Sequence, residues 1–368
     1  MFTDLCERAG IRYPIFAFSH CRDVVAAVSL AGGMGVLGTT RFSPEQLERE
    51  LAWLDRKLEG KPYGVDLIFA GEGPKDASGD MLPEGHRHFV QSLIERFRIP
   101  PPGGHTSEEH GVGRNLVMTG KHAAEICEVA MRHPVRLLAS ALGPAPAAIV
   151  AQAKARGMLI AGLIGRVEHV KRHVSGGSDL LVATGTEAGG HCGEIGTLAL
   201  VPQVVRAAQG LPVLAAGGIA TGEQIAACLA LGAQGVWTGS LWLTTVESDV
   251  DPVVKRKLLE AGSLDTIRST AMTGKPSRHL ANAWIRAWHE PGAPAPLAAP
   301  WQGMLNEGAL VGAYEKRMES LMGTPAGQGV GLMHDAMTVR DVFHRLLEEY
   351  GTAAERSQEL YARALERG

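Results

Sequence analysis

The segment 180-LLVATGTEAGGHCG-193, together with 211-LPVLAAGG-218 and 235-GVWTGS-240, determines the fold class of this chain. Each part begins with a short run rich in apolar residues and contains glycines after it, and helix-like residues separate the runs. Short apolar runs of this kind are typical of parallel strands that are buried on both faces of a sheet. Glycines directly after such strands allow backbone N–H groups to approach a ligand closely. The segment therefore predicts a parallel sheet whose strand ends bind an anion such as a phosphate.

The same alternation of strand and helix extends back to the N-terminus. Helix signals lie between the strand runs: Ser43-Pro44 precedes an amphipathic segment, and Thr221-Gly222 precedes IAACLALGA. Eight such units predict a closed (β/α)8 TIM barrel, with an open doubly wound sheet as the alternative. The expected strands are 14–19, 34–38, 62–69, 136–142, 159–164, 180–185, 212–216 and 235–239.

Two segments interrupt this alternation of strands and helices. Residues 71–121 follow the third strand and are rich in Gly, Pro, Ser and charged residues, which predicts a long inserted loop, with a lid as one option. From residue 251 onward helical patterns replace the strand runs, including the long segment 339–366. We therefore expect a barrel over 1–250, interrupted by the insertion, and a helical extension over 251–368 that packs on the barrel.

Composition restricts the classes of function. The chain has 368 residues, 45% of them hydrophobic, which is enough for one large core, and its net charge of −3 is spread without a basic face. These features argue against a nucleic-acid partner, and no apolar run approaches the ~20 residues that span a bilayer. The N-terminal residues lack the apolar segment of a secretion signal. We expect a soluble cytoplasmic protein that acts on a small molecule, with a homodimer as an open option.

Residues 33–38 (GMGVLG) match the GxGxxG pattern of dinucleotide-binding sites. That pattern requires a strand before it and a helix after it. Here a helix-like segment precedes the glycines and a strand follows them. The glycines are therefore interpreted as a helix stop and a tight turn, and a Rossmann site is not supported.

Four residues at the ends of the last two expected strands are candidates for phosphate binding. Gly217 and Gly218 follow the seventh strand run, and Gly239 and Ser240 follow the eighth. In (β/α)8 barrels the loops after these two strands commonly bind phosphate through backbone N–H groups, and the Ser240 hydroxyl adds a donor. One glycine pair alone could equally form a tight turn. Two such turns, one βα unit apart, favour a phosphate site.

His191 is the main candidate for acid–base chemistry. It lies in the loop after the sixth strand, at the barrel end where catalytic groups are found, and imidazole titrates near neutral pH. Cys192 is a weaker candidate, as a nucleophile, because the sequence shows no activating partner for it. The five cysteines are scattered without a CxxC pair, so we expect no metal. A metal site formed by His20-Cys21 and His191-Cys192 is the alternative.

Three blocks of the sequence resemble the nitronate monooxygenase family, formerly called 2-nitropropane dioxygenases. They are GTEAGGHCGEIGTLALVPQVV at 185–205, LPVLAAGGIATGEQIAACLALGAQGVWTGSLWLTT at 211–245 and AGQGVGLM at 326–333. The resemblance begins at the first strand, YPIFAFSH at 13–20, and covers most of the chain. It implies a barrel that binds FMN non-covalently, with the flavin phosphate at the seventh and eighth strand ends.

The resemblance also implies roles for individual residues. His191, the histidine of AGGHxG, would lie over the flavin ring and perform the proton chemistry, with His20 as a second candidate. Gln328 resembles a family glutamine that approaches the cofactor from the C-terminal extension. The residues expected to bind the cofactor are Ala17, Phe18, Ser19, Asp66, Thr184, Gly185, Gly189, Gly190, Gly217, Gly218, Gly239, Ser240 and Gln328.

This chain departs from the family pattern at three places. Phe18, Ser19 and His20 stand where the family usually has a proline and a methionine after the first strand. Asp66 replaces the asparagine of a GVNL pattern, and Thr184 stands where many members have glutamine. A carboxylate near an electron-rich flavin disfavours the anionic reduced form, unless the carboxylate is protonated or paired, for example with His20.

The family implies oxidation of alkyl nitronates or nitroalkanes with O2, giving a carbonyl compound and nitrite. An alternative on the same scaffold is an NAD(P)H-dependent flavin reductase that acts on an enoyl thioester or a quinone. For that reaction Arg268, Lys275 and Arg278 could bind a nucleotide or a coenzyme A moiety. A third hypothesis, from another class of protein, is a flavin-binding module without turnover.

Overall fold

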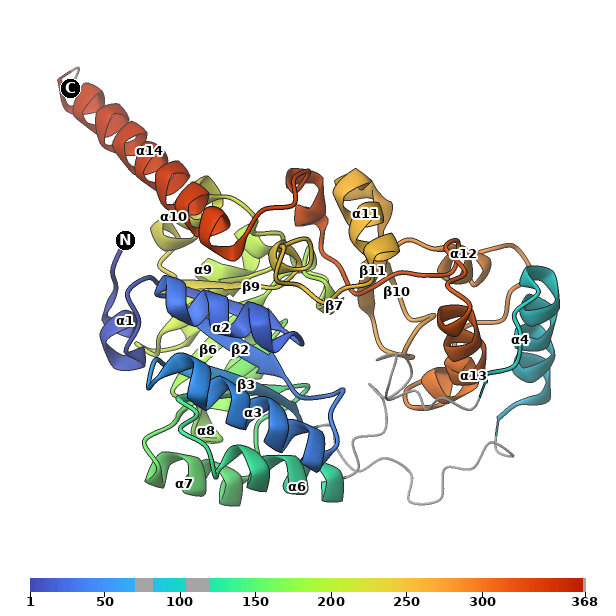
Figure 1. Ribbon diagram of the computed structural model, residues 1–368. Helices are drawn as coiled ribbons and strands as arrows, with labels where there is room; N and C mark the ends of the chain where they lie inside the picture. Colours follow the sequence, from blue (N-terminus) through green and yellow to red (C-terminus); the bar gives the residue numbers. More distant parts are fainter. Residues whose placement is uncertain (70–81, 104–119, 367–368) are drawn as a thin grey trace.

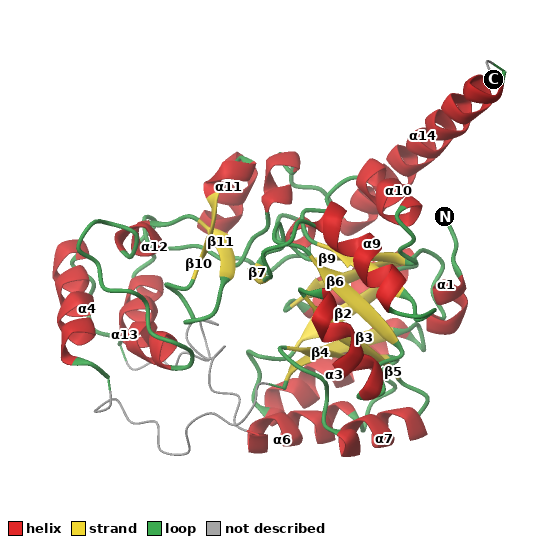
Figure 2. Ribbon diagram, turned by 180° about the vertical axis from the view of Figure 1, so that it is seen from behind, coloured by secondary structure: helices red, strands yellow, loops and turns green. Residues whose placement is uncertain are grey.

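The computed structural model describes residues 1–69, 82–103 and 120–366, which include a closed barrel of eight parallel strands (Figure 1 and Figure 2). The strand order is β1-β2-β3-β4-β5-β6-β8-β9, and β9 pairs with β1 to close the barrel. The expected (β/α)8 barrel is therefore confirmed, and the open doubly wound alternative is wrong. The barrel strands are β1 (Ile15–Ser19), β2 (Met34–Gly38), β3 (Tyr63–Ile68), β4 (Leu137–Ala141), β5 (Leu159–Ile164), β6 (Leu180–Thr184), β8 (Val213–Ala216) and β9 (Gly235–Thr238).

Most helices of the barrel part cover the outside of the strands (Figure 1). Ser43 begins α3 with a capping box, in which the Ser43 hydroxyl accepts from the Gln46 N–H and the Gln46 side chain accepts from the Ser43 N–H. Thr221 and Gln224 form the same arrangement at α10. Both helices thus begin where the sequence predicts. The helices of this part are α1 (Asp4–Ala9), α2 (Arg22–Ala31), α3 (Pro44–Leu58), α6 (Gly120–Ala130), α7 (Ala147–Ala155), α8 (Val170–Ser175), α9 (Thr197–Ala207) and α10 (Gly222–Ala230).

The GMGVLG segment is a helix end followed by a strand. Gly32, with a φ angle of 101°, ends α2, and β2 begins at Met34. A Cβ atom at Gly35 would lie only 2.2 Å from the Val25 carbonyl oxygen, so this glycine allows α2 to pack closely on β2. The order of helix and strand is the reverse of a Rossmann site, which confirms the interpretation of these glycines.

The barrel interior is a packed core. Phe16 and Met34 are completely buried in it, and Trp237 stacks on Phe16. Leu5 and Cys6 of α1 belong to the same apolar cluster, so α1 covers the N-terminal end of the barrel. Because this end is closed, a ligand can reach the strands only at their carboxyl ends.

The C-terminal extension contains strands as well as helices, which corrects the expectation of an all-helical segment. β10 (Thr266–Ser269) and β11 (Ser277–Leu280) form a small antiparallel sheet with β7 (Gly190–His191), a two-residue strand from the loop after β6. The sequence did not indicate these strands because they are short and polar, and because the strand that joins them comes from a distant part of the chain. The helices that accompany them are α11 (Pro252–Glu260), α12 (Ala283–Ala287) and α13 (Trp301–Glu315).

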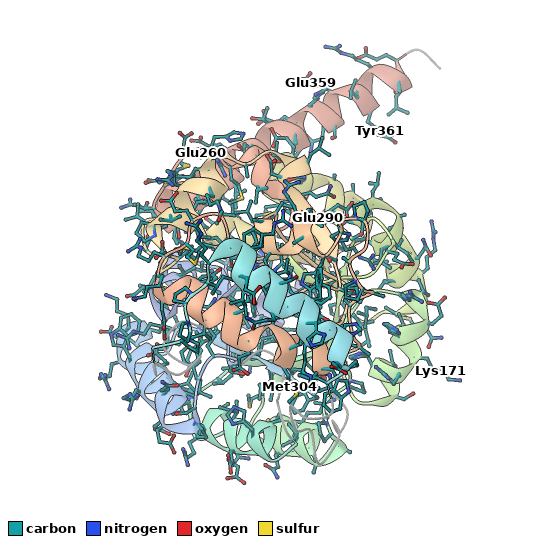
Figure 3. The ribbon with its side chains drawn as sticks, turned by 90° about the vertical axis from the view of Figure 1, so that its right-hand side faces the viewer. Lys171, Glu260, Glu290, Met304, Glu359 and Tyr361 are labelled. Carbon is teal, nitrogen blue, oxygen red and sulfur yellow. The ribbon has the colours of Figure 1, made fainter. Side chains whose placement is uncertain are left out.

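The described part of the insertion contains helix α4 (Glu84–Phe97), which lies beside α13 (Figure 3). Val90 and Leu93 of α4 pack in one apolar cluster with Trp284 and Trp288 of the extension. This part of the insertion therefore covers the extension and is helical, where the sequence predicted a loop. The rest of the expected loop, and with it the lid, falls on residues 70–81 and 104–119, which lie outside the described residues.

The last helix, α14 (Val339–Leu365), returns to the barrel and packs between α2 and α10. Val339, Phe343 and Leu346 are buried in the core cluster of the barrel, whereas the C-terminal half of the helix projects away from it (Figure 1). The end of the chain therefore completes the ring of helices around the barrel. None of the helices in the described ranges is long and apolar enough to cross a membrane.

Candidate functional site

A cavity of about 1310 Å³ lies at the carboxyl ends of the barrel strands. Its wall includes residues that follow the strands, such as His20 and Gly239, and residues of the extension, such as Tyr314 and His279. Ordinary small-molecule sites have volumes of about 300–1,000 Å³. The cavity is therefore large enough for a cofactor together with a substrate.

The glycine turns after β8 and β9 present unused backbone donors to this cavity. Gly217 and Gly218 have φ angles of 110° and 71°, which L-amino acids rarely adopt. The N–H groups of Gly218 and Gly239 make no hydrogen bond with any described residue, and both glycines line the cavity. Ser240 Oγ accepts from the Gly327 N–H at 2.8 Å, which leaves its own hydrogen free to donate. These three donors fit a phosphate dianion.

Glu187 anchors the loop between β6 and α9. Its carboxylate accepts from the Thr197 N–H at 2.9 Å and from Thr197 Oγ1 at 2.9 Å. The N-terminus of α9 is therefore occupied by a protein carboxylate, and the unused donors are those of the two glycine turns. The sequence did not indicate this role, because no motif connects Glu187 with a threonine at the start of the next helix.

His191 lies on β7, opposite Ser277 of β11, and lines the cavity. Its Nε2 is 3.1 Å from Thr273 Oγ1, and the Thr273 hydroxyl donates its only hydrogen to the Lys275 carbonyl oxygen at 3.0 Å. With the Thr273 hydrogen assigned to the Lys275 carbonyl oxygen, Thr273 accepts from His191; this assignment places the ring hydrogen on Nε2 and leaves a lone pair on Nδ1. Burial, together with the nearby Lys275 ammonium, lowers the pKa of His191 to about 4. The ring is thus a neutral base at physiological pH.

His20, the second candidate, follows β1. Its Nδ1 is 2.9 Å from the Gly38 carbonyl oxygen, which can only accept, so Nδ1 carries the hydrogen and Nε2 is the basic nitrogen. Phe18 contacts the ring edge to face, with centroids 5.1 Å apart. Burial, and then the charge of Arg41, lowers the pKa of His20 to about 3. His20 therefore also remains neutral.

Asp66 lies near the end of β3 with 7% of its surface exposed, and it lines the cavity. Its Oδ1 has no hydrogen-bond partner among the described residues. Burial raises the pKa of Asp66 to about 7, so much of this carboxyl group is protonated at neutral pH. The pairing with His20 that the sequence suggested is not found: Asp66 Oδ1 has no partner among the described residues, and the His20 ring bonds to the Gly38 carbonyl oxygen through Nδ1. Protonation, and not ion pairing, reduces the negative charge beside the cavity.

Most of the other residues expected to bind the cofactor also line the cavity. Phe18 and Ser19 do so from β1, and Ser19 Oγ accepts from the Cys21 N–H at 3.0 Å. Thr184 lines it at the end of β6, and Gly189 and Gly190 line it from the following loop. The residues after β1 and after β6 thus share one cavity with the glycine turns.

Three of the expected residues lie elsewhere. Ala17 is completely buried in the barrel wall. A Cβ atom at Gly185 would lie 2.1 Å from Thr197 Oγ1, so this glycine allows α9 to approach the end of β6. Gln328 lines a second pocket, of about 340 Å³. Gly217 and Gly218 also line this second pocket. The packing of Ala17 and Gly185 explains these two residues without a ligand contact.

Cys192 does not have the surroundings of a nucleophile. It is half-buried, and burial raises the pKa of its thiol despite the nearby guanidinium groups of Arg268 and Arg278. Its Sγ lies 3.6 Å from the Thr186 carbonyl oxygen. No group of three His, Cys, Asp or Glu side chains in the described ranges could hold a metal ion.

Three residues of the extension that line the cavity, Thr273, Ser277 and His279, were not recognisable from the sequence. Thr273 orients His191, and Ser277 Oγ lies 2.8 Å from His279 Nε2. His279 is buried, and burial with the neighbouring His191 lowers its pKa to about 3. These residues reach the cavity because β11 pairs with β7, and no local motif indicates that pairing.

Lowering the pH from about 7 to about 5 is expected to destabilise the protein. An unfolded histidine gains a proton near its ordinary pKa of 6.5, whereas the folded-state pKa of His20 and His279 is about 3. The unfolded state therefore binds more protons, and the free energy of unfolding falls by about 2 kcal/mol per buried histidine. Asp66 opposes this trend, because its raised pKa makes the folded state bind the proton more tightly. Urea unfolding at both pH values measures the net change.

The control for this prediction compares a buried with an exposed histidine. His279→Gln should reduce the pH dependence of the free energy of unfolding, since one titrating group is removed. His88→Gln is the matched surface substitution, because the His88 side chain is 75% exposed. An unaltered pH dependence in His279→Gln would contradict the assigned burial effect.

Comparison with known proteins agrees with this architecture. The putative monooxygenase Rv1533 of Mycobacterium tuberculosis is 46% identical over 369 residues, which cover 95% of this chain and 96% of that protein. A nitroalkane oxidase structure from Streptomyces ansochromogenes is 27% identical with a TM-score of 0.78, covering 96% of this chain and 99% of that chain. The structure of FabK from Thermotoga maritima is 25% identical with a TM-score of 0.75, covering 98% and 99%. A family model described as nitronate monooxygenase matches residues 4–349, and the chain therefore belongs to this family of flavin-dependent oxidoreductases.

Proposed function

We propose that this protein oxidises alkyl nitronates and nitroalkanes to carbonyl compounds and nitrite, using bound FMN and O2. The observation that supports this most is the neutral imidazole of His191, whose Nδ1 is unprotonated and whose Nε2 is fixed by Thr273 at the wall of the large cavity. A nitroalkane must lose a proton from carbon to become a nitronate, and such a step needs a positioned base. The solved nitroalkane oxidase with the same fold is consistent with this substrate class.

The cavity fits FMN through the donors at the strand ends. The N–H groups of Gly218 and Gly239 and the Ser240 hydroxyl would hold the phosphate, because they are the donors left without a partner there. Phe18 and Gly190 would lie near the flavin ring, as the family resemblance implies. The flavin, when bound, supplies the electron-accepting chemistry and the reaction with oxygen.

The chain's own residues bind the substrate and move its proton. His191 Nδ1 would accept the α-proton of a neutral nitroalkane, giving the nitronate anion and an imidazolium. Burial disfavours an isolated imidazolium, but the nitronate formed beside it offsets part of that cost. Asp66, when protonated, adds no negative charge that would repel the anion. Residues of the extension, such as Tyr314 and His279, form part of the cavity wall.

The proposal is tested first on the cofactor and then on the substrate. Purified protein should be yellow and should release FMN on denaturation, identified by mass. The FMN-loaded protein should release nitrite from an alkyl nitronate in air. FMN-loaded protein that releases no nitrite would exclude the substrate but not the cofactor, whereas colourless protein that binds no added FMN would exclude both.

The second candidate, an NAD(P)H-dependent flavin reductase, is favoured by the size of the cavity and by its basic wall. Arg268 and Lys275 line the cavity, and the volume exceeds that of one ordinary ligand. The two reactions differ in their reductant, so anaerobic mixing with nitronate or with NADPH separates them. We expect rapid bleaching of the flavin absorbance with nitronate and little with NADPH. The reverse result would favour the reductase.

A further inference from the structure

Arg41 is a cation without a partner in the wall of the cavity. It lies between β2 and α3, two residues before the capping residue Ser43, and it lines the cavity. Its Nε is inaccessible to solvent and has no acceptor. Across the described part of the chain, no residue forms a hydrogen bond with the guanidinium or an ion pair within 4 Å. A guanidinium has five N–H donors, and in Arg41 none of them has an acceptor among the described residues.

The groups near Arg41 do not satisfy it. Asp249, Tyr314 and Cys21 are close enough to affect its pKa, which burial lowers. The Tyr314 hydroxyl is already engaged, because it donates to the Gly323 carbonyl oxygen and accepts from the Gly323 N–H. Asp249 forms no ion pair within 4 Å among the described residues. Arg41 therefore has negative charge nearby but no direct acceptor.

Arg278 shows what a structural arginine looks like in the same cavity region. It is 8% exposed, its Nε donates to the Thr186 carbonyl oxygen at 2.9 Å, and its Nη1 donates to Thr266 Oγ1 at 3.2 Å. It holds the loop after β6 against the small sheet. Arg41 holds no segment in this way, so its function is not explained by the fold.

Arg41 is half-buried, and its Nε has lost its hydration without gaining an acceptor, which is unfavourable. A cavity ligand with negative charge would remove this penalty. The planar fork of a guanidinium binds two oxygens of one anion at the same time. Nitronates and carboxylates both have this shape, with two oxygens on one planar centre. The flavin phosphate has a different set of donors, at Gly218, Gly239 and Ser240.

We propose that Arg41 binds the anionic group of the substrate, a planar group with two oxygens, on the His20 side of the cavity. The group is either the nitronate itself or a carboxylate at the other end of the substrate. The substrate assignment rests on the proposed function, whereas anion binding by Arg41 does not. Arg41 acts as a specificity residue: it selects anions over neutral molecules of the same size.

The test uses FMN-loaded protein and inorganic nitrate, a planar anion that is not turned over. In the wild type, nitrate should perturb the flavin absorbance and raise the Tm. In Arg41→Gln the dissociation constant of nitrate should rise at least about 10-fold. The rise should be smaller in Arg41→Lys, because lysine keeps the positive charge but lacks the planar pair of N–H donors. Arg49→Gln is the matched control, because Arg49 lines the same cavity on α3 but is exposed.

Two nitronates of equal length, with and without a terminal carboxylate, distinguish the two sources of the anion. A rise in KM for both in Arg41→Gln assigns Arg41 to the nitronate group, and a rise for the carboxylate-bearing one alone assigns it to the carboxylate. If nitrate binding depends on Arg41 but no nitronate is oxidised, the anion site remains and the proposed function fails.

Three results would overturn the proposal. Nitrate could bind equally to the wild type and to Arg41→Gln. FMN affinity could fall in Arg41→Gln, which would place Arg41 in the cofactor site. The Tm of Arg41→Gln without added anions could also fall below that of the wild type, which would indicate a structural role. We expect an equal or higher Tm instead, because the substitution removes a half-buried charge whose Nε has no acceptor, and it breaks no hydrogen bond to the described residues.

Discussion

His191→Ala is expected to lower kcat/KM for a neutral nitroalkane by about 10²- to 10⁴-fold, the usual contribution of a positioned general base. The side chain has the free Nδ1 needed to accept the α-proton, and Thr273 holds its other nitrogen at 3.1 Å. The effect on a preformed nitronate should be much smaller, because that substrate has already lost the proton. Steady-state nitrite release with the two substrates measures the difference.

The pH profile supplies an independent check on the same residue. Because burial lowers the pKa of His191 to about 4, the base is deprotonated over the neutral range. For neutral nitroalkane, kcat/KM should therefore stay level from neutral pH down to about pH 5 and fall only as the pH approaches 4. A fall centred near 6.5, the ordinary pKa of histidine, would show that His191 is not buried in the working enzyme.

His20 is the comparison for the assignment of the base. Its pKa of about 3 and its bond to the Gly38 carbonyl oxygen make it a weaker base with a similar free nitrogen. His20→Ala should therefore lower kcat/KM for the neutral nitroalkane less than His191→Ala does. If the order of the two effects is reversed, His20 is the base and the assignment of His191 is wrong.

Gly217→Val is expected to abolish flavin retention and to lower the free energy of unfolding by about 2 kcal/mol or more. The φ angle of Gly217 is 110°, and a Cβ atom there would lie 2.8 Å from Thr197 Oγ1 and 3.1 Å from the Gly185 carbonyl oxygen. The turn must therefore move, and the Gly218 N–H moves with it. Each charged hydrogen bond lost to the phosphate should weaken FMN binding by about 10- to 100-fold. Flavin fluorescence titration and urea unfolding measure the two effects.

Gly239→Ala separates flavin binding from folding. No atom lies within 4 Å of the position of its added Cβ, and its φ angle of −129° suits any residue. The free energy of unfolding of the apoprotein should therefore remain near the wild-type value. The methyl group would nevertheless occupy space beside the Gly239 N–H, so FMN affinity should fall. Wild-type FMN affinity in Gly239→Ala would contradict a phosphate site at this turn.

The barrel could be predicted because its signals are local. Each strand is an apolar run that is buried on both faces, as in LLVAT of β6, and each run ends at residues that break it. Ser43 and Thr221 begin their helices with caps that are visible within four residues. The candidate site could be predicted in part for the same reason, since Gly217 and Gly239 directly follow strands and His191 lies in the loop after β6.

The remaining features depend on contacts between distant segments. TIRS and SRHL pair with each other, and SRHL also pairs with Gly190 and His191, which brings Thr273 to His191. The expected pairing of His20 with Asp66 is not found: His20 bonds to the Gly38 carbonyl oxygen through Nδ1, and Asp66 Oδ1 has no partner among the described residues. The sequence alone thus determined the barrel, the glycine turns and the basic residue after β6, which are encoded by neighbouring residues. Only the tertiary structure decided which nitrogen of His191 contacts Thr273, the raised pKa of Asp66 and the lack of a direct acceptor for Arg41 among the described residues, because burial and hydrogen bonding between distant segments arise only when these segments meet.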